Sequence, residues 1–170
     1  MILENVKSRC QHKDWSCGPA SIRSLFYYYG ISVSEQELIQ YGEISEEGTD
    51  FATMRKLANE YGFSFWSTYM GTIEDIKKWL NKKIPVLVCY QLGNPSGFNG
   101  HYSVVFGVDD NYIWLSDPSN YDEGAGKKFT ENRKMTIKKF MKHWFEYDNG
   151  IKYKKWYAII KLKKYAKRKI

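Results

Sequence analysis

The stretch QHKDWSCGPASIRSLFYYYG, residues 11–30, carries the strongest structural signal in the chain. From Ile22 onward its apolar residues recur at i, i+3, i+4 and i+7, the spacing of one helix face, and Gly30 follows as a stop signal. The spacing predicts a helix over 18–29 with Cys17 at its N-terminus. Unpaired backbone N–H groups and the positive end of the helix dipole favour a thiolate there, and the thiolate is the nucleophilic form of cysteine.

The pattern changes between the two halves of the chain. The first half continues with helical periods and capping signals, which predict helices at 34–40, 54–61 and 72–82, and a later helix begins at Thr136. The second half is rich in short stretches of β-branched and aromatic residues. These predict strands at 63–68, 84–90, 101–108, 112–117 and 156–162. The order indicates an α+β fold in which a helical N-terminal half packs on a mainly antiparallel sheet.

Length and composition describe one ordinary globular domain. The 170 residues are 43% hydrophobic and 17% aromatic, which excludes disorder over most of the chain. No linker or repeat divides them, so we expect a single domain over 1–162. No apolar stretch approaches the ~20 residues of a membrane-spanning helix, and Met1 to Glu4 lack the basic-then-apolar order of a secretory signal. We therefore expect a cytoplasmic protein with reduced thiols.

The net charge of +7 is concentrated at the C-terminus. Residues 151–170 hold nine lysines and arginines and no acidic residue, so the rest of the chain is close to neutral. The basic tail at 163–170 has the charge to contact an anionic membrane surface or a nucleic acid. The alternative is a solvated terminus that adds solubility.

His101 and Asp117 are the candidate partners of a nucleophilic Cys17. His101 begins a predicted strand directly after the loop GNPSGFNG, where a side chain can project from a sheet edge into a cleft. A hairpin turn centred on Asp109 places Asp117 opposite His101, close enough to orient the imidazole. The expected result is a Cys-His-Asp triad, in which the acid holds the correct tautomer of the base.

The remaining cysteines and histidines have weaker claims. Cys89 lies in the apolar run PVLVCY and is expected in the core, and Cys10 has no helix terminus beside it. His143 lies on an amphipathic helix among lysines and is expected to be solvated. Cys10, His12 and Cys17 lack the paired spacing of a structural zinc site, so we expect neither a metal nor another cofactor.

The motifs resemble a known family of peptidases. Gln11 and Cys17 within QHKDWSCGPASIRSLFYYYG, followed by GHYSVVFGVDD and WLSDPS, are similar to the bacteriocin-processing, double-glycine leader peptidases and their stand-alone relatives among the papain-like cysteine peptidases. The resemblance runs from about Gln11 to Pro118. It implies a papain-like fold with Cys17 as nucleophile, His101 as general base and acid, and Asp117 as orienter. Gln11 is implied as a side-chain donor to the oxyanion hole, beside the backbone N–H of Cys17.

The sequence departs from the family in two respects. Ser16 stands where family members often have Asp, and the 170 residues hold no transporter or ATPase domain. The resemblance implies a preference for small residues, typically glycine, before the scissile bond. The aromatic side chains expected to narrow the cleft there, and so to contact substrate, are Trp15, Phe98 and Tyr102.

The expected activity is hydrolysis of a peptide bond in a peptide or protein substrate. A related acyl transfer by the same triad, such as deamidation or transamidation, stays open as an alternative. A non-catalytic module that binds a peptide in its cleft is a second alternative, although all four site positions are filled.

Overall fold

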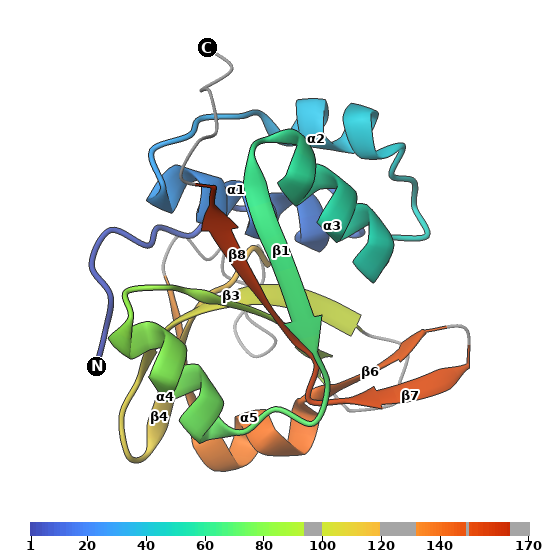
Figure 1. Cartoon of the computed structure of the whole chain (residues 1–170). Helices are drawn as coiled ribbons and strands as arrows, with labels where there is room; N and C mark the ends of the chain where they lie inside the picture. Colours follow the sequence, from blue (N-terminus) through green and yellow to red (C-terminus); the bar gives the residue numbers. More distant parts are fainter. Residues whose placement is uncertain (94–99, 120–131, 149, 164–170) are drawn as a thin grey trace.

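The computed structural model describes residues 1–93, 100–119, 132–148 and 150–163 (Figure 1). The helices are α1 (Cys17–Tyr28), α2 (Glu35–Gly42), α3 (Phe51–Glu60), α4 (Ile73–Asn81) and α5 (Ile137–His143). The strands are β1 (Phe63–Thr68), β2 (Val86–Gln91), β3 (Gly100–Val108), β4 (Tyr112–Ser116), β5 (Arg133–Thr136), β6 (Phe145–Asp148), β7 (Ile151–Lys154) and β8 (Tyr157–Leu162). In Figure 1, α1, α2 and α3 gather at one end of the molecule and α4 and α5 at the other, with the sheet between them. None of the described helices is long and apolar enough to cross a membrane.

Six strands form one sheet in the order β1-β8-β2-β3-β4-β5, and every neighbouring pair is antiparallel. β6 and β7 form a separate antiparallel hairpin. The predicted α+β fold, with a helical N-terminal half and a mainly antiparallel sheet, is confirmed. β5 and the β6–β7 hairpin were not predicted, because β5 and β7 are mostly exposed and show no continuous apolar pattern.

Capping side chains explain most of the helix starts. The N-cap side chains of α2, α3, α4 and α5 each accept a bond from the backbone N–H three residues further on, and Thr72 and Asp75 form a full capping box at α4. The exception is α1, whose N-cap Ser16 makes no such bond. The first-turn amides of the helix that carries Cys17 are therefore not occupied by a capping side chain.

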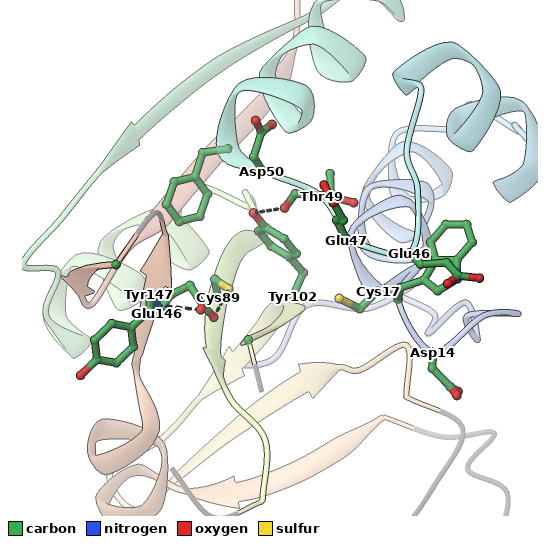
Figure 2. Close-up of a pocket in the computed structure, with 15 residues that line it drawn as sticks. Asp14, Cys17, Glu46, Glu47, Thr49, Asp50, Cys89, Tyr102, Glu146 and Tyr147 are labelled. Carbon is green, nitrogen blue, oxygen red and sulfur yellow. Dashed lines mark hydrogen bonds between the residues drawn. The ribbon is translucent and has the colours of Figure 1, made fainter. Parts of the chain in front are cut away.

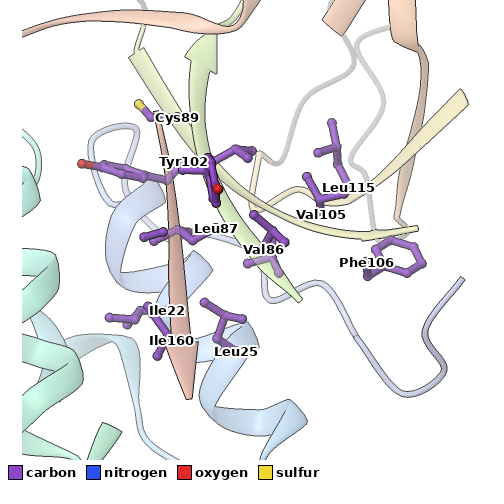
Figure 3. Packing of buried hydrophobic residues seen from close by; sticks show 14 of the residues in the cluster. Ile22, Leu25, Val86, Leu87, Cys89, Tyr102, Val105, Phe106, Leu115 and Ile160 are labelled. Atoms are coloured by element: carbon purple, nitrogen blue, oxygen red, sulfur yellow. The ribbon is translucent and has the colours of Figure 1, made fainter. Parts of the chain in front are cut away.

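Apolar packing holds α1 against the sheet. Ile22 is fully buried in one core cluster with Leu87 of β2 and Ile160 of β8, and Figure 3 shows residues of this cluster. Burying one such side chain contributes ~1.5–3 kcal/mol to stability. The Ser21 hydroxyl adds a hydrogen bond of 2.9 Å to the backbone carbonyl of Tyr102. This packing fixes the N-terminus of α1 relative to the start of β3.

The register of the β3–β4 hairpin differs from the prediction. The prediction paired His101 with Asp117, whereas the partner of Val104 is Ser116, two residues out of the expected register. The turn is centred near position 110 rather than 109, and a β-bulge follows Val105. Asp117 therefore lies past the end of β4 and is not the ladder partner of His101.

Candidate active site

Cys17 and His101 meet where α1 packs against β3. Cys17 is the first residue of α1 and is half-buried, and His101 is the second residue of β3 and is 3% exposed. Burial alone lowers the pKa of His101, but the Asp117 carboxylate and a hydrogen bond with the Cys17 thiol raise that pKa to about 10. The imidazole is therefore positively charged at neutral pH, directly beside the thiol.

Asp117 contacts the imidazole from the end of β4. Its Oδ1 lies 2.7 Å from His101 Nε2 and accepts the backbone N–H of Ser119 at 2.9 Å. Its Oδ2 accepts the Tyr90 hydroxyl at 2.9 Å and pairs with Arg133 Nε at 3.1 Å. Burial alone raises the pKa of Asp117, but His101, Arg133 and the Ser119 amide lower it to about 2. The carboxylate thus holds the ring through Nε2.

Two partners of Asp117 escaped the sequence analysis. Tyr90 lies in β2 and Arg133 opens β5, and the sequence shows no motif that links either residue to Asp117. They meet at Asp117 because β2 and β5 flank the β3–β4 pair in the sheet. Only the order of the strands in the folded sheet identifies these two residues as partners of Asp117.

Gln11 lies beside the Asp117 loop, but its amide group bonds within its own loop. The Gln11 backbone N–H donates to the Pro118 carbonyl at 2.9 Å. The side-chain Nε2 donates to the carbonyl oxygens of Lys13 and Asp14 at 2.8 and 3.0 Å. An amide NH₂ has two hydrogens, so both are used in this conformation. The predicted oxyanion role requires one of them to turn toward the substrate.

A buried carboxylate anchors the loop between Gln11 and Cys17. Glu35, in the first turn of α2, is buried and accepts the Ser16 hydroxyl at 2.6 Å and the His12 backbone N–H at 3.0 Å through Oε1. Its Oε2 lies 2.8 Å from His12 Nδ1. Ser16 is the position at which the sequence departs from its family's frequent Asp. Here the Ser16 side chain binds a carboxylate that comes from another helix.

A pocket of about 700 Å³ opens beside Cys17 (Figure 2). Two of the three aromatic residues expected to contact substrate, Trp15 and Tyr102, line it, and the third, Phe98, lies outside the described residues. The Tyr102 hydroxyl donates to the Thr49 carbonyl at 3.0 Å. A side chain of β3 is thereby joined to the loop before α3 at the wall of the pocket.

The same loop packs closely on the first turn of α1. A Cβ atom at Gly18 would lie 2.6 Å from Oγ1 of Thr49, far inside van der Waals contact. Glycine directly after Cys17 therefore allows the Thr49 loop to approach the nucleophile.

The prediction of a solvated His143 is wrong, whereas the prediction of a buried Cys89 is right. His143 was predicted to be solvated, but it is buried, with Nδ1 3.0 Å from the carbonyl of Gln91, because α5 packs that face against β2. The prediction of a buried Cys89 is confirmed, and Cys89 also lines the pocket, where its thiol donates to Glu146 at 3.4 Å. Burial raises the pKa of Cys89. Its thiol therefore stays protonated, whereas a cysteine nucleophile reacts as the thiolate.

Metal ligands do not gather in the part of the chain that the structure describes. Within 1–93, 100–119, 132–148 and 150–163, no group of three or more His, Cys, Asp and Glu side chains is placed to hold a metal ion. Cys10 and His12, considered with Cys17 in the sequence, thus form no such site in the described residues.

Comparison with known proteins places the chain in a family. The model of the Peptidase C39 family matches residues 5–148. The chain belongs to this family. The match confirms the predicted family and the predicted enzyme class, a cysteine peptidase.

Individual relatives of this C39 chain come from larger transport systems. The lactococcin-G-processing and transport ATP-binding protein LagD of Lactococcus lactis subsp. lactis is 26% identical over 134 residues, which are 79% of this chain but only 17% of LagD. The solved peptidase domain of Streptococcus ComA, a bifunctional ABC transporter, has a TM-score of 0.72 at 20% identity, over 93% of this chain and 99% of that one. A double-glycine motif protease from an AMS/PCAT transporter, solved with the leader peptide, has a TM-score of 0.66 at 18% identity, over 95% of each chain. At these identities the two structures show a shared fold.

Proposed function

We propose that this C39-family chain hydrolyses peptide bonds through a triad of Cys17, His101 and Asp117. The observation that carries the proposal is a buried His101–Asp117 pair next to Cys17, which lines the pocket. Nε2 of His101 lies 2.7 Å from Oδ1 of Asp117, and the Cys17 thiol, which lines the pocket, is one of the groups that raise the pKa of the same ring. A neighbouring imidazole and a helix N-terminus are the surroundings in which cysteine nucleophiles are generally activated.

In the proposed reaction the Cys17 thiolate attacks the carbonyl carbon of the scissile bond. The backbone N–H of Cys17 and the side chain of Gln11 donate to the resulting oxyanion, and each such donor lowers the barrier by ~3 kcal/mol. His101 passes its proton to the leaving amine as the C–N bond breaks, which leaves a thioester on Cys17. The same imidazole then takes a proton from water, whose oxygen attacks the thioester and releases the acid. Asp117 orients the ring and stabilises its charged form.

We propose that the residues directly before the scissile bond are small, with Gly-Gly the preferred pair. The position of Tyr102 supports this, because its large side chain lines the pocket that holds the thiol and is fixed by the hydrogen bond to Thr49. Trp15 adds a second large side chain at the pocket wall. The similar AMS/PCAT protein is a double-glycine motif protease that was solved in complex with the leader peptide. The proposed partner is accordingly a peptide or protein substrate.

Covalent labelling tests the nucleophile. A Gly-Gly peptide with a C-terminal electrophile should add once to the wild-type protein and to the Cys10→Ala variant, and should not add to Cys17→Ala. Intact mass measures the adduct, and peptide mapping locates it. Labelling of Cys10 at the rate of Cys17 would contradict the assignment.

Product analysis separates the alternative activities. Hydrolysis of an unmodified Gly-Gly peptide yields two fragments whose summed mass exceeds the substrate by one water, whereas deamidation leaves one chain and releases ammonia. Tight binding without any product would support the non-catalytic module.

Three further expectations stay predictions. They are a cytoplasmic location, the division into one domain over 1–162 and a tail over 163–170, and contact of that tail with an anionic membrane surface or a nucleic acid. The structure describes only Lys163 of the tail, whose backbone N–H donates to the Gly62 carbonyl at 3.0 Å.

A further inference from the structure

The pocket that holds Cys17 is lined by acidic side chains. The carboxylate-bearing residues of its lining are Asp14, Glu46, Glu47, Asp50 and Glu146, and the described lining includes no lysine or arginine. Figure 2 shows Asp14 and Glu46 near Cys17 on one side and Glu146 on the other side, beyond Tyr102. A peptide that reaches the thiol therefore passes carboxylates on both walls.

Among the residues that the structure describes, four of these carboxylates, Asp14, Glu46, Glu47 and Asp50, have no ion-pair partner. Asp14, Glu46 and Glu47 are exposed, and none of them forms an ion pair with a described residue. Asp50 is also exposed and bonds to the backbone N–H of Thr53. A concave surface lined by one sign of charge focuses its field and raises the local concentration of an oppositely charged ligand. The pocket should therefore attract cations.

Aromatic rings lie among the carboxylates and point independently to a cationic ligand. Trp15, Phe51, Tyr102 and Tyr147 all line the same pocket. Phe51 is stacked on Trp156 and Tyr102 is buried, so the accessible rings are those of Trp15 and Tyr147. The faces of such rings attract lysine and arginine side chains, by ~0.5–1 kcal/mol at exposed sites. Carboxylates alternating with aromatic rings provide both parts of the recognition of a basic side chain.

The spread of the charges favours an extended ligand over a single ion. No three of the described acidic side chains are placed to coordinate one metal ion. A pocket of about 700 Å³ is large enough for a short extended peptide segment, since a chain advances ~3.3–3.6 Å per residue. Positive charges distributed along a peptide can meet both walls at once.

We infer that this pocket selects peptides that carry lysine or arginine within a few residues of the scissile bond. The inference rests on the proposed peptidase function, because Cys17 lies in the same pocket. The small residues before the bond lie beside Tyr102 and Cys17, and the flanking basic side chains contact Glu46 and Glu47 at the pocket wall.

Three matched peptides test the inference. Each carries Gly-Gly before the scissile bond, and the flanking positions are Lys, Ala or Glu. We expect kcat/KM for the Lys peptide to exceed that for the Glu peptide by about tenfold or more at low ionic strength, and the ratio to fall as salt is added. Equal kcat/KM for the two peptides would overturn the inference and leave the peptidase function intact.

Charge-neutral variants locate the effect. The double variant Glu46→Gln/Glu47→Gln should lower the Lys-to-Glu ratio at least about threefold. The control Glu4→Gln/Glu74→Gln removes two charges from residues that do not line the pocket, and should leave the ratio unchanged. An equal drop in both double variants would show an effect of net charge alone and overturn the assignment to the pocket.

Binding separates this inference from the proposed function. The Cys17→Ala variant should bind the Lys peptide more tightly than the Glu peptide, as measured by fluorescence anisotropy. If no peptide is cleaved by the wild-type protein but this order of affinity is observed, the peptidase function fails and the charge selectivity stands. Without any difference in affinity, the charge selectivity fails.

Discussion

Oδ1 of Asp117 lies 2.7 Å from Nε2 of His101, although the two residues are not partners in the β3–β4 ladder. Asp117 follows the last residue of β4, so its backbone is not held in the ladder and its side chain can reach the imidazole. The contact joins a negative and a positive side chain that are both almost fully buried. The chemistry and the stability of the protein should therefore both depend on this pair.

The pair should make stability fall at both ends of the pH range. The pKa of Asp117 is lowered from 3.8 to about 2, so its contribution to the free energy of unfolding is present above about pH 4 and is lost as the pH falls through about 2. The pKa of His101 is raised from 6.5 to about 10, so its contribution is present below about pH 6.5 and is lost as the pH rises through about 10. Urea denaturation across pH measures both windows. In Asp117→Asn the free energy of unfolding should change less with pH in both windows. If its slope against pH is unchanged, the ion pair is contradicted.

Asp117→Asn should lower kcat far more than Tyr90→Phe. Asparagine removes the charge that stabilises the imidazolium, and loss of positioned acid–base catalysis costs about 10²–10⁴-fold. Tyr90→Phe removes one hydrogen bond but keeps the carboxylate and its contacts with His101 and Arg133, so we expect a loss of less than about tenfold. Steady-state kinetics with a Gly-Gly peptide measure both. Similar losses in the two variants would argue against a charge-based role for Asp117.

Gln11→Ala should lower kcat by about 10²–10³-fold with little change in KM, because an oxyanion donor acts in the transition state. The matched control is Gln40→Ala, at an exposed position of α2. An unchanged kcat in Gln11→Ala would show that Gln11 is not an oxyanion donor. Its side-chain amide would then serve only to form hydrogen bonds within the 11–14 loop.

Glu35→Ala should loosen the loop before the nucleophile. The Ser16 hydroxyl and the His12 amide lose their acceptor, and the free energy of unfolding should fall by about 1–3 kcal/mol. The exposed Gln36, next to Glu35 in α2, provides the control Gln36→Ala. Because the loop carries the oxyanion donor, kcat should fall more than KM rises, and Ser16→Asp in the Glu35→Ala background should recover part of kcat. A loss of stability with normal kcat would make Glu35 a structural residue only.

Removal of residues 164–170 should leave kcat/KM for a short Gly-Gly peptide unchanged, since every residue assigned to the site precedes position 151. The truncation keeps Lys163, whose amide bonds to Gly62. Binding to anionic vesicles or to nucleic acid, if the tail provides it, should be sensitive to salt and should disappear on truncation. Loss of peptide cleavage in the truncated protein would contradict this separation.

Short-range patterns were sufficient for most of the elements. The apolar period after Cys17 predicted α1 and placed the thiol at its N-terminus, and Ser34 with Glu37 predicted the start of α2. The turn signal at Asp109 predicted the β3–β4 hairpin. A hairpin at this position places His101 and Asp117 at the same end. These predictions succeed because the interactions behind them join residues a few positions apart.

Tertiary structure alone decided the rest of the site. Tyr90 and Arg133 reach Asp117 because β2, β3, β4 and β5 are adjacent in the sheet, and Glu35 reaches Ser16 because α2 packs beside α1. The acidic pocket likewise combines the loop before α3 with β6, nearly a hundred residues later. A sequence pattern determines which face of an element is apolar. Which distant side chains meet depends on how those faces pack together, and neither hydrophobic period nor turn chemistry encodes that arrangement.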